Sequence, residues 1–281
     1  MSEDNTKNLP RKINPAQTFE NLVEWVGTES RKHHAPGLII GISGTDSLLT
    51  YLACAEAYER QGKGNRVLGL HFDHLAEAIP EAGSDKITCL KDEFKWVVRD
   101  IVPWLKSVAP KAEIEIDQTL LLSDDNQRWG KLFSRAIADV PQSGEMTNQH
   151  YFPVGTRNAT EDYLGSYSQI SKAVSMMPIV DLFKSEVMEI CDYLQVPDIA
   201  MEKSREIDCA CGRFDIPAFH MQELDWVIMN KKGMLSEAFL NDNIDKDLLR
   251  DINAFVTEER ILNAFRKETP YEPASNLVAE L

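Results

Sequence analysis

Short apolar runs alternate along this chain with longer stretches in which apolar residues recur three or four positions apart. The short runs predict β-strands at residues 38–42, 67–72, 113–117 and 151–154. The longer stretches predict helices at residues 16–34, 48–60, 87–105 and 126–139. Because strands that alternate with helices build parallel sheets, the pattern predicts an α/β fold: a doubly wound parallel sheet with helices on both faces.

From residue 184 onward the pattern is helical, and it predicts helices at residues 184–195, 218–230, 245–253 and 255–267. We expect residues 16–281 to form a single domain whose last part, from about residue 205 to 281, is a helical C-terminal arm. Residues 1–15 start polar and acidic and lack the apolar run of a signal peptide, so we expect them to be a disordered lead-in.

The loop after the first strand, Gly-Ile-Ser-Gly-Thr-Asp-Ser at residues 41–47, has the composition of a phosphate site. Glycines let the backbone approach an anion, and the N–H groups of the following helix point at it. Asp46 adds a carboxylate where a magnesium ion could bind beside the phosphates. The loop lacks the Gly-Lys-Ser/Thr ending of a Walker loop. An ordinary strand-to-helix turn capped by Asp46 is the alternative interpretation.

Two further polar segments follow strands. His71-Phe72-Asp73-His74 ends the second strand, and Gly-Thr-Arg-Asn-Ala-Thr-Glu at residues 155–161 follows the fourth. Ligands of open α/β sheets bind beyond the carboxyl ends of the strands. We therefore expect residues 41–47, 71–74 and 155–161 to meet at one edge of the sheet.

Motifs along residues 38–204 resemble known enzymes. The loop from Ser43 to Ser47 resembles the pyrophosphate loop of the N-type ATP pyrophosphatases, usually Ser-Gly-Gly-x-Asp-Ser. The downstream motifs resemble those of NAD synthetase in order and spacing. They are Gly155-Thr156 with Glu161, a Gly-aromatic segment at 165–167, Pro178-x-x-x-Leu182-x-Lys184-x-x-Val187, Leu194-Gln195-Val196-Pro197 and Lys203-Ser204.

The resemblance implies an adenine nucleotide alpha hydrolase-like fold and an amide-forming ligase. Such an enzyme uses ATP and Mg²⁺ to adenylate the nicotinate carboxylate of deamido-NAD, and ammonia then displaces AMP to give NAD. No nitrilase-like extension precedes residue 38, so we expect ammonia to come free or from a separate protein. The resemblance also implies a homodimer, and we expect a cytoplasmic enzyme.

The same resemblance implies roles for individual residues. Those with catalytic roles are Asp46 and Lys184, the latter as a mobile positive charge that reaches the phosphates. The ATP-binding residues are Ser43, Gly44, Thr45, Ser47, His71, Thr156, Lys184 and Ser204. The metal ligands are Asp46 and Glu161, since magnesium prefers carboxylate oxygens. The substrate-binding residues are Arg157, Tyr167, Lys172 and Lys267. Structural roles are the alternative: Glu161 as a first-turn helix acid, Lys184 as a solvated helix residue and Ser204 as a helix N-cap.

Several positions depart from the family pattern. The loop has five residues from Ser43 to Ser47 where the family has six, which predicts one N–H donor fewer. His71 stands where the family tends to carry Arg, and Gln169-Ile170-Ser171-Lys172 stands where it has Lys-Phe-Gly-Asp. Two alternatives therefore stay open. One is a ligase of the same fold with a different carboxylate substrate, and the other is a nucleotide-binding protein that has lost catalysis.

Composition narrows the function further. The chain of 281 residues has a formal charge of −15, which argues against non-specific nucleic-acid binding through basic patches. No run of 18 apolar residues occurs, so we expect no membrane span. The five cysteines fit reduced thiols. Cys209 and Cys211 lack the spacing of a zinc pair.

Overall fold

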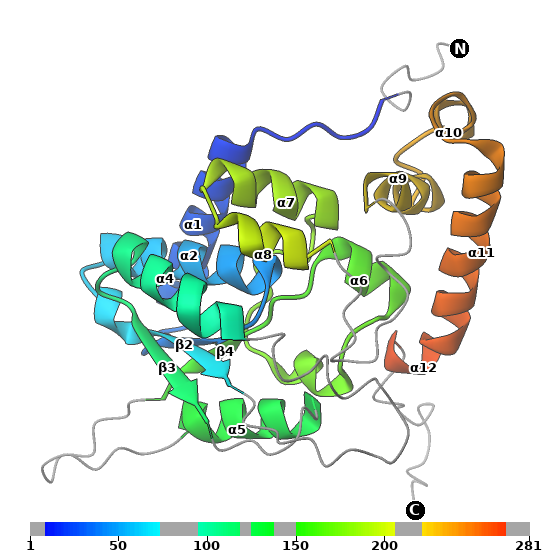
Figure 1. The fold of residues 1–281 in the computed structure, drawn as a ribbon. Helices are drawn as coiled ribbons and strands as arrows, with labels where there is room; N and C mark the ends of the chain where they lie inside the picture. The colour runs from blue at the N-terminus through cyan, green and yellow to red at the C-terminus, as the bar shows by residue number, and fades with distance from the viewer. Residues whose placement is uncertain (1–8, 74–94, 119–124, 138–149, 206–220, 268–281) are drawn as a thin grey trace, which may run out of the picture.

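The computed structural model describes residues 9–73, 95–118, 125–137, 150–205 and 221–267. Within them a parallel sheet has the strand order β3-β2-β1-β4 (Figure 1). The strands are β1 (Leu38–Ile42), β2 (Val67–Phe72), β3 (Glu113–Asp117) and β4 (Phe152–Val154). The predicted parallel sheet is confirmed. Three strands have the predicted bounds, and β4 begins one residue later than expected.

The strand register brings the predicted site segments together. Ile42 at the end of β1 pairs with His71 of β2, while Ile40 pairs with Val154 of β4 on the other side. From β1 the chain crosses to β2 on one side, and β4 later joins on the opposite side. This reversal between β1 and β4 is the place where ligands enter doubly wound sheets.

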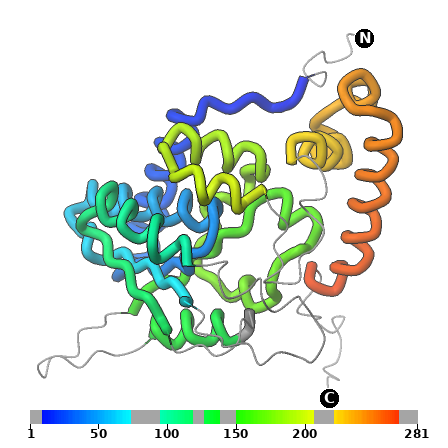
Figure 2. Tube along the Cα trace, in the orientation of Figure 1, coloured from blue at the N-terminus to red at the C-terminus, as the bar shows by residue number. Residues whose placement is uncertain are grey.

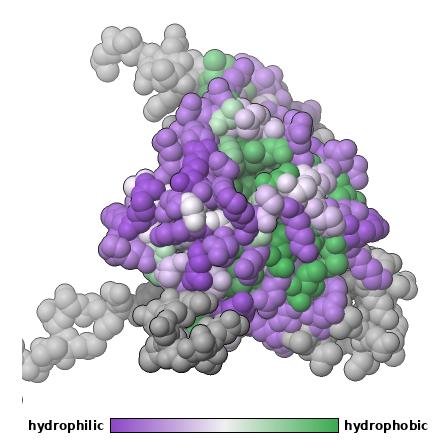
Figure 3. All heavy atoms as spheres, turned by 90° about the vertical axis from the view of Figure 1, so that its left-hand side faces the viewer, coloured by the Kyte–Doolittle hydropathy of each residue, from purple (hydrophilic) through white to green (hydrophobic). Residues whose placement is uncertain are grey.

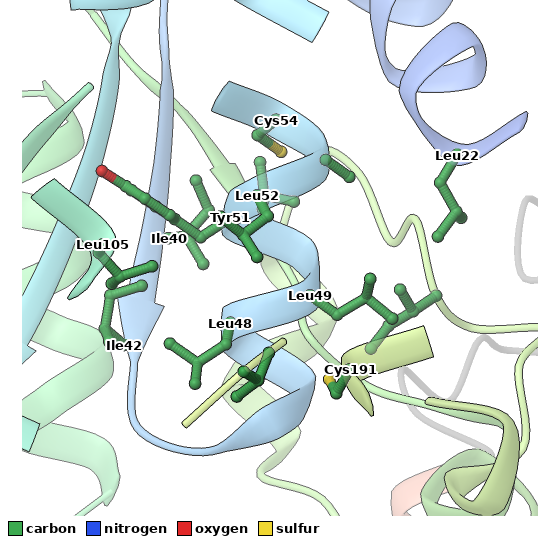
Figure 4. Close-up of a cluster of buried hydrophobic side chains, with 14 of the residues drawn as sticks. Leu22, Ile40, Ile42, Leu48, Leu49, Tyr51, Leu52, Cys54, Leu105 and Cys191 are labelled. Atoms are coloured by element: carbon green, nitrogen blue, oxygen red, sulfur yellow. The ribbon is translucent and has the colours of Figure 1, made fainter. Parts of the chain in front are cut away.

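Alternate side chains of β1 enter two separate cores. Ile40 and Ile42 pack with α1 (Pro15–Lys32) and α2 (Thr45–Arg60), as Figure 4 shows for the α2 side chains. Ile39 packs on the opposite face with side chains of α5 (Asp125–Ile137). Apolar side chains cover this strand on both faces, which explains its continuous apolar run. Helices on both faces of the sheet are therefore confirmed.

The helix before β3 contains a π-helical segment, η4 (Val97–Ile101), followed by α4 (Val102–Val108). The predicted helix 87–105 is confirmed from residue 95 on and extends to Val108, while residues 87–94 lie outside the described part. The N–H of Val102 bonds to Val97 O, one residue further back than in an α-helix. Pro103 explains the wider turn, because it has no N–H to donate to the preceding turn.

Shorter helices complete the part of the fold around the predicted site. They are η2 (Gly64–Arg66), α6 (Ala159–Leu164), η5 (Gln169–Ala173), α7 (Lys184–Tyr193) and α8 (Asp198–Lys203). The helix predicted at 184–195 is confirmed as α7, two residues shorter. The sequence pattern missed α6 and α8, since each has only six residues and therefore less than two helical turns.

The described C-terminal helices are α9 (Met221–Lys231), α10 (Glu237–Asn243), α11 (Lys246–Leu262) and α12 (Ala264–Lys267). The prediction of separate helices at 245–253 and 255–267 is wrong, since α11 runs through residue 254 without a break. No Gly or Pro interrupts α11, and the helix is followed by its C-cap residue Asn263, whose N–H bonds to Glu259 O. Figures 1 and 2 show α9 and α11 beside α6, while α10 lies against α9 and α11.

The C-terminal helices have a hydrophobic cluster of their own. Side chains of α9, α10 and α11 pack there with Leu164 of α6 and with Phe183 just before α7. Through α6 and α7 this second cluster is joined to the elements that surround the loop after β1. The division into one domain with a C-terminal arm stays a prediction.

Residues 9–14, which we expected to belong to a disordered lead-in, lie in the described part. Arg11 donates two bonds to Glu186 of α7, one of them from Nε at 2.6 Å, and a third to Asp181 O at 2.7 Å. Its guanidinium also lies over the Phe183 ring at 5.2 Å. Asn14 then caps α1 by accepting the N–H of Gln17. The N-terminal segment is thus fastened to the start of α7.

On the face drawn in Figure 3, hydrophilic residues surround hydrophobic residues that gather at its centre. At the end of the C-terminal helices, Ile261, Leu262 and Phe265 are 71%, 60% and 47% exposed. None of the described helices is long and apolar enough to cross a membrane.

Candidate active site

The loop between β1 and α2 consists of Ser43 and Gly44 only. Gly44 is the N-cap residue of α2, so the N–H groups of the first helical turn face the end of the sheet. The Ser47 hydroxyl accepts the Ser43 N–H at 2.8 Å and donates to Gly44 O at 2.7 Å. Ser47 is 1% exposed, so its hydroxyl shapes the loop from beneath. Asp46 does not cap α2, and the alternative of an Asp46-capped turn is therefore wrong.

Lys184 connects α7 to this loop. Its Nζ donates to Thr45 Oγ1 at 2.9 Å and forms an ion pair with Asp46. The Thr45 hydroxyl also bonds to Ser204 Oγ at 2.8 Å. Ser204 ends α8 rather than starting a helix, so its alternative role as an N-cap is wrong. Side chains from α2, α7 and α8, up to 159 residues apart in sequence, thus meet at one point.

The ammonium of Lys184 is held in its charged form. Burial alone would lower its pKa, but the carboxylates of Asp46 and Glu161 outweigh burial and raise the pKa above its usual value. The Lys184 side chain is 13% exposed, which excludes the alternative of a solvated surface lysine. Nearby, burial raises the pKa of the Cys191 thiol to about 12, so this group stays neutral.

Asn158 is a site residue that the sequence interpretation missed. Its Nδ2 donates to Asp46 Oδ1 at 2.9 Å, and its Oδ1 accepts the Glu161 N–H at 2.9 Å. The Glu161 carboxylate accepts the Asn158 N–H at 3.4 Å, which completes a capping box at the start of α6. The spacing Asn-x-x-Glu could have revealed the cap, but the bond to Asp46 spans 112 residues.

The two acidic side chains predicted to hold magnesium share neighbours. Asn158 bonds to both Asp46 and Glu161, and both carboxylates act on the charge of Lys184. In the described part of the chain no group of three or more His, Cys, Asp or Glu side chains forms a metal cluster. Magnesium usually takes one or two carboxylates and completes its shell with water and phosphate oxygens, so this donor pair fits a magnesium–ATP site.

His71 and Thr156 lie at the same edge of the sheet. The His71 ring is 1% exposed, with Nδ1 2.9 Å from Ile42 O. Burial lowers its pKa, which favours the neutral ring. Its Nε2 is buried and has no hydrogen-bond partner among the residues that the structure describes. Thr156 follows Gly155, whose N–H bonds to Met176 O at 2.8 Å.

Of the four predicted substrate residues, the structure brings Arg157 and Tyr167 into contact and places Lys267 within electrostatic reach of Arg157. The Arg157 guanidinium stacks on the Tyr167 ring at 3.8 Å and donates to Asp162 at 3.1 Å. Lys267 instead donates to the carbonyl of Tyr163 at 3.2 Å. Desolvation lowers the pKa of Lys267. Lys172 lies on η5 and is partly buried.

Comparison with known proteins identifies the family. The family model for NAD synthase matches residues 18–270. The chain belongs to the NAD synthase family. The match to the family model extends beyond the motifs at residues 38–204 and includes the C-terminal helices. The resemblance stated from the motifs is thereby confirmed.

Individual members of the NAD synthase family are similar over most of the chain. The NH(3)-dependent NAD(+) synthetase of Fusobacterium nucleatum is 32% identical over 246 residues, covering 85% of this chain and 90% of the relative. The NH(3)-dependent NAD(+) synthetase of Methanosarcina acetivorans is 27% identical over 231 residues, covering 79% of this chain and 84% of the relative. The fold is shared with a Campylobacter jejuni NH3-dependent NAD synthetase (TM-score 0.59, 17% identity, 93% and 100% covered). It is also shared with a Francisella tularensis NMN synthetase (TM-score 0.62, 18% identity, 93% and 99% covered).

Proposed function

We propose that this member of the NAD synthase family is an ATP-dependent ligase that adenylates the nicotinate carboxylate of deamido-NAD and transfers ammonia to it. The products are NAD, AMP and pyrophosphate. The observation that carries the proposal is the bridge of Lys184 to Thr45 and Asp46, with Ser204 on the same threonine. This bridge places a cation over the loop that would hold the pyrophosphate.

The first reaction step breaks the bond between the α-phosphorus of ATP and the bridging oxygen of the pyrophosphate. A substrate carboxylate oxygen attacks the α-phosphorus, and negative charge develops on the leaving pyrophosphate. The N–H groups at the start of α2 and the ammonium of Lys184 lie where they can stabilise this charge. In the second step the ammonia nitrogen attacks the acyl carbon, AMP leaves, and the nitrogen loses a proton.

Asp46 and Glu161 are the residues that would hold magnesium. When bound, the metal supplies positive charge to the phosphate oxygens and orients them for displacement. We expect Asp46→Asn and Glu161→Gln each to reduce ATP turnover strongly. If turnover and its magnesium dependence are unchanged in both variants, the assignment is wrong.

A different carboxylate substrate is the second candidate, and the composition of the acceptor side favours it. Lys172 stands where the family has an acid, and Arg157 is stacked on Tyr167 within the predicted substrate region. A fold shared with an NMN synthetase is compatible with either substrate.

The test is pyrophosphate release by the purified protein with ATP, magnesium and ammonia. Deamido-NAD and nicotinate mononucleotide are supplied separately, and the amide product is identified by mass. Amide formation from deamido-NAD at the higher kcat/KM supports the proposal. A preference for the mononucleotide selects the second candidate. If neither carboxylate leads to pyrophosphate release, the remaining interpretation is a nucleotide-binding protein that has lost catalysis.

A homodimer and a cytoplasmic location belong to the same proposal and are supported by the motif resemblance. The exposed Ile261 and Leu262 on α11 offer an apolar face that a symmetric partner could cover. A monomer by light scattering at micromolar concentration would contradict the dimer. Recovery of the native protein in a membrane fraction would contradict the location.

A further inference from the structure

The start of α7 has no side-chain acceptor at its N-cap position. The N-cap residue is Phe183, whose side chain has no oxygen to accept the first helical N–H groups. The N–H of Phe183 is accepted by Glu186 at 2.8 Å. The next two N–H groups, those of Lys184 and Ser185, are directed away from α7 toward other elements. What accepts them also determines where the Lys184 backbone lies.

Those acceptors come from α6 and from the C-terminal helices. The Lys184 N–H donates to Thr160 Oγ1 at 3.0 Å, and the Ser185 N–H donates to Asp225 Oδ2 at 2.7 Å. The Thr160 hydroxyl in turn donates to Asp225 Oδ1 at 2.5 Å. The Asp225 carboxylate on α9 therefore fixes both N–H groups. It accepts the Ser185 N–H directly, and it accepts the proton of the Thr160 hydroxyl, whose oxygen accepts the Lys184 N–H.

The position of Asp225 is unusual for a residue with only a structural role. Its side chain is 0% exposed, and a buried carboxylate is costly unless its acceptors are used. The charged groups that act on it are Glu186, which repels it, and Arg11, which attracts it and is itself paired with Glu186. Packing of α9 against the second cluster would be served by an apolar residue at this position.

We infer that Asp225 is a positioning residue for Lys184: from α9 it fixes the start of α7 so that the Lys184 ammonium reaches Thr45 and Asp46. This inference rests on the proposed role of Lys184 at the pyrophosphate. Asp225 also connects the C-terminal helices to the nucleotide loop, through the Ser185 N–H and Thr160. A displacement of a charged group by about 1 Å can cost about a hundredfold in rate.

The test is a double-mutant cycle of Asp225→Asn with Lys184→Ala. Asparagine keeps the size of the side chain but presents one acceptor instead of two, so one link to α7 is lost. We expect Asp225→Asn to lower kcat for pyrophosphate release about tenfold to a hundredfold per correctly folded molecule. In the Lys184→Ala background the same change should have no more than about a twofold effect, because the group through which Asp225 acts is gone.

Two further variants keep the result decisive. Thr160→Val removes the acceptor of the Lys184 N–H and should reproduce the loss, whereas Thr160→Ser retains the hydroxyl and should restore most of the rate. Ile228→Val perturbs the same helix and the same buried cluster without touching the links, and it serves as the packing control. If Asp225→Asn does not fold, the double-mutant cycle is made with Thr160→Val and Lys184→Ala, and Thr160→Ser serves as the control that retains the hydroxyl.

The inference is overturned if the loss of kcat in the double variant equals the product of the losses in Asp225→Asn and Lys184→Ala. It is also overturned if Ile228→Val loses as much kcat as Asp225→Asn, and Asp225 is then a structural residue. Wild-type turnover separates this outcome from failure of the proposed function. If the wild type forms no amide, the cycle is repeated with the dissociation constant of magnesium–ATP measured by calorimetry, where the same non-additivity is expected.

Discussion

Replacement of Asn158 by Asp tests the geometry around Asp46. In the wild type the amide nitrogen donates to Asp46 at 2.9 Å, while the amide oxygen caps α6 through the Glu161 N–H. Aspartate is as good an N-cap as asparagine, so the cap is preserved. A carboxylate has no hydrogen to donate, however, and the bond to Asp46 becomes a contact between two negative charges. The variant thus removes one of the two functions of the side chain.

The expected magnitude follows from the distance. Two unit charges 2.9 Å apart at an effective dielectric of about 20 repel by about 6 kcal/mol. Uptake of a proton by one carboxyl limits the penalty, because protonating an aspartate at pH 7 costs about 4 kcal/mol. Lys184 beside Asp46 reduces it further. We therefore expect Asn158→Asp to lower the free energy of unfolding by about 2–4 kcal/mol at pH 7 and by less at pH 5.

The matched control is Asn158→Ser, which also caps α6 but is too short to reach Asp46. It loses a hydrogen bond to a charged group without adding a charge, so we expect a tenfold to hundredfold loss in turnover, corresponding to about 1.5–3 kcal/mol. The assays are urea unfolding and pyrophosphate release, each across a magnesium titration. Magnesium should restore stability to Asn158→Asp, since a ligand bound to the native state stabilises it.

Two outcomes of the Asn158→Asp experiment would contradict the contact with Asp46 or the role of Asp46 as a metal ligand. If Asn158→Asp unfolds at the wild-type urea concentration at pH 7 without magnesium, the contact with Asp46 is not formed in solution. If it is destabilised but magnesium does not restore it, Asp46 is not a metal ligand.

Inserting Gly between Gly44 and Thr45 gives the loop the usual family length. We expect the affinity for ATP, measured by calorimetry, to rise about tenfold because the insertion adds one N–H donor. Loss of turnover in this variant would show that the shorter loop is adapted to its own geometry. Burial raises the pKa of Asp225 from 3.8 to about 6. The native state therefore binds this proton more tightly than the unfolded chain, and stability from this group falls as pH rises through 6. Relative to Asp225→Asn, urea unfolding of the wild type should lose about 1 kcal/mol between pH 5.5 and pH 7, and parallel pH profiles would contradict the shift. Replacing Ile261 and Leu262 by Asp should yield a monomer by light scattering, and an unchanged mass would exclude this face as the dimer contact.

The sequence predicted the sheet well because its signals are local. The apolar run at β1 and the small residues after it are contiguous, and the parallel arrangement follows from the alternation of elements. The convergence of Asp46 and Lys184, 138 residues apart, was available only through the family resemblance. No periodicity in the chain indicates that these two side chains meet.

What the sequence could not show depends on tertiary contacts. The roles of Asn158 and Asp225 come from bonds that span 112 and 40 residues. The π-helical segment before α4 depends on how a proline is accommodated in a helix that continues. The sequence interpretation divided α11 at Ala254, although no Gly or Pro interrupts the helix there. Packing in the second cluster decides its length.

The bond between Arg11 and Glu186 also has a consequence for the order of folding during synthesis. The two residues are 175 positions apart, so a ribosome adding 5–20 residues per second makes the second roughly 10–35 s after the first. Helix α1 and strands β1 and β2 are complete long before the start of α7 exists. The N-terminal segment therefore cannot form these contacts until the start of α7 has been synthesised, so the attachment of this segment is a late step in the folding of the nascent chain.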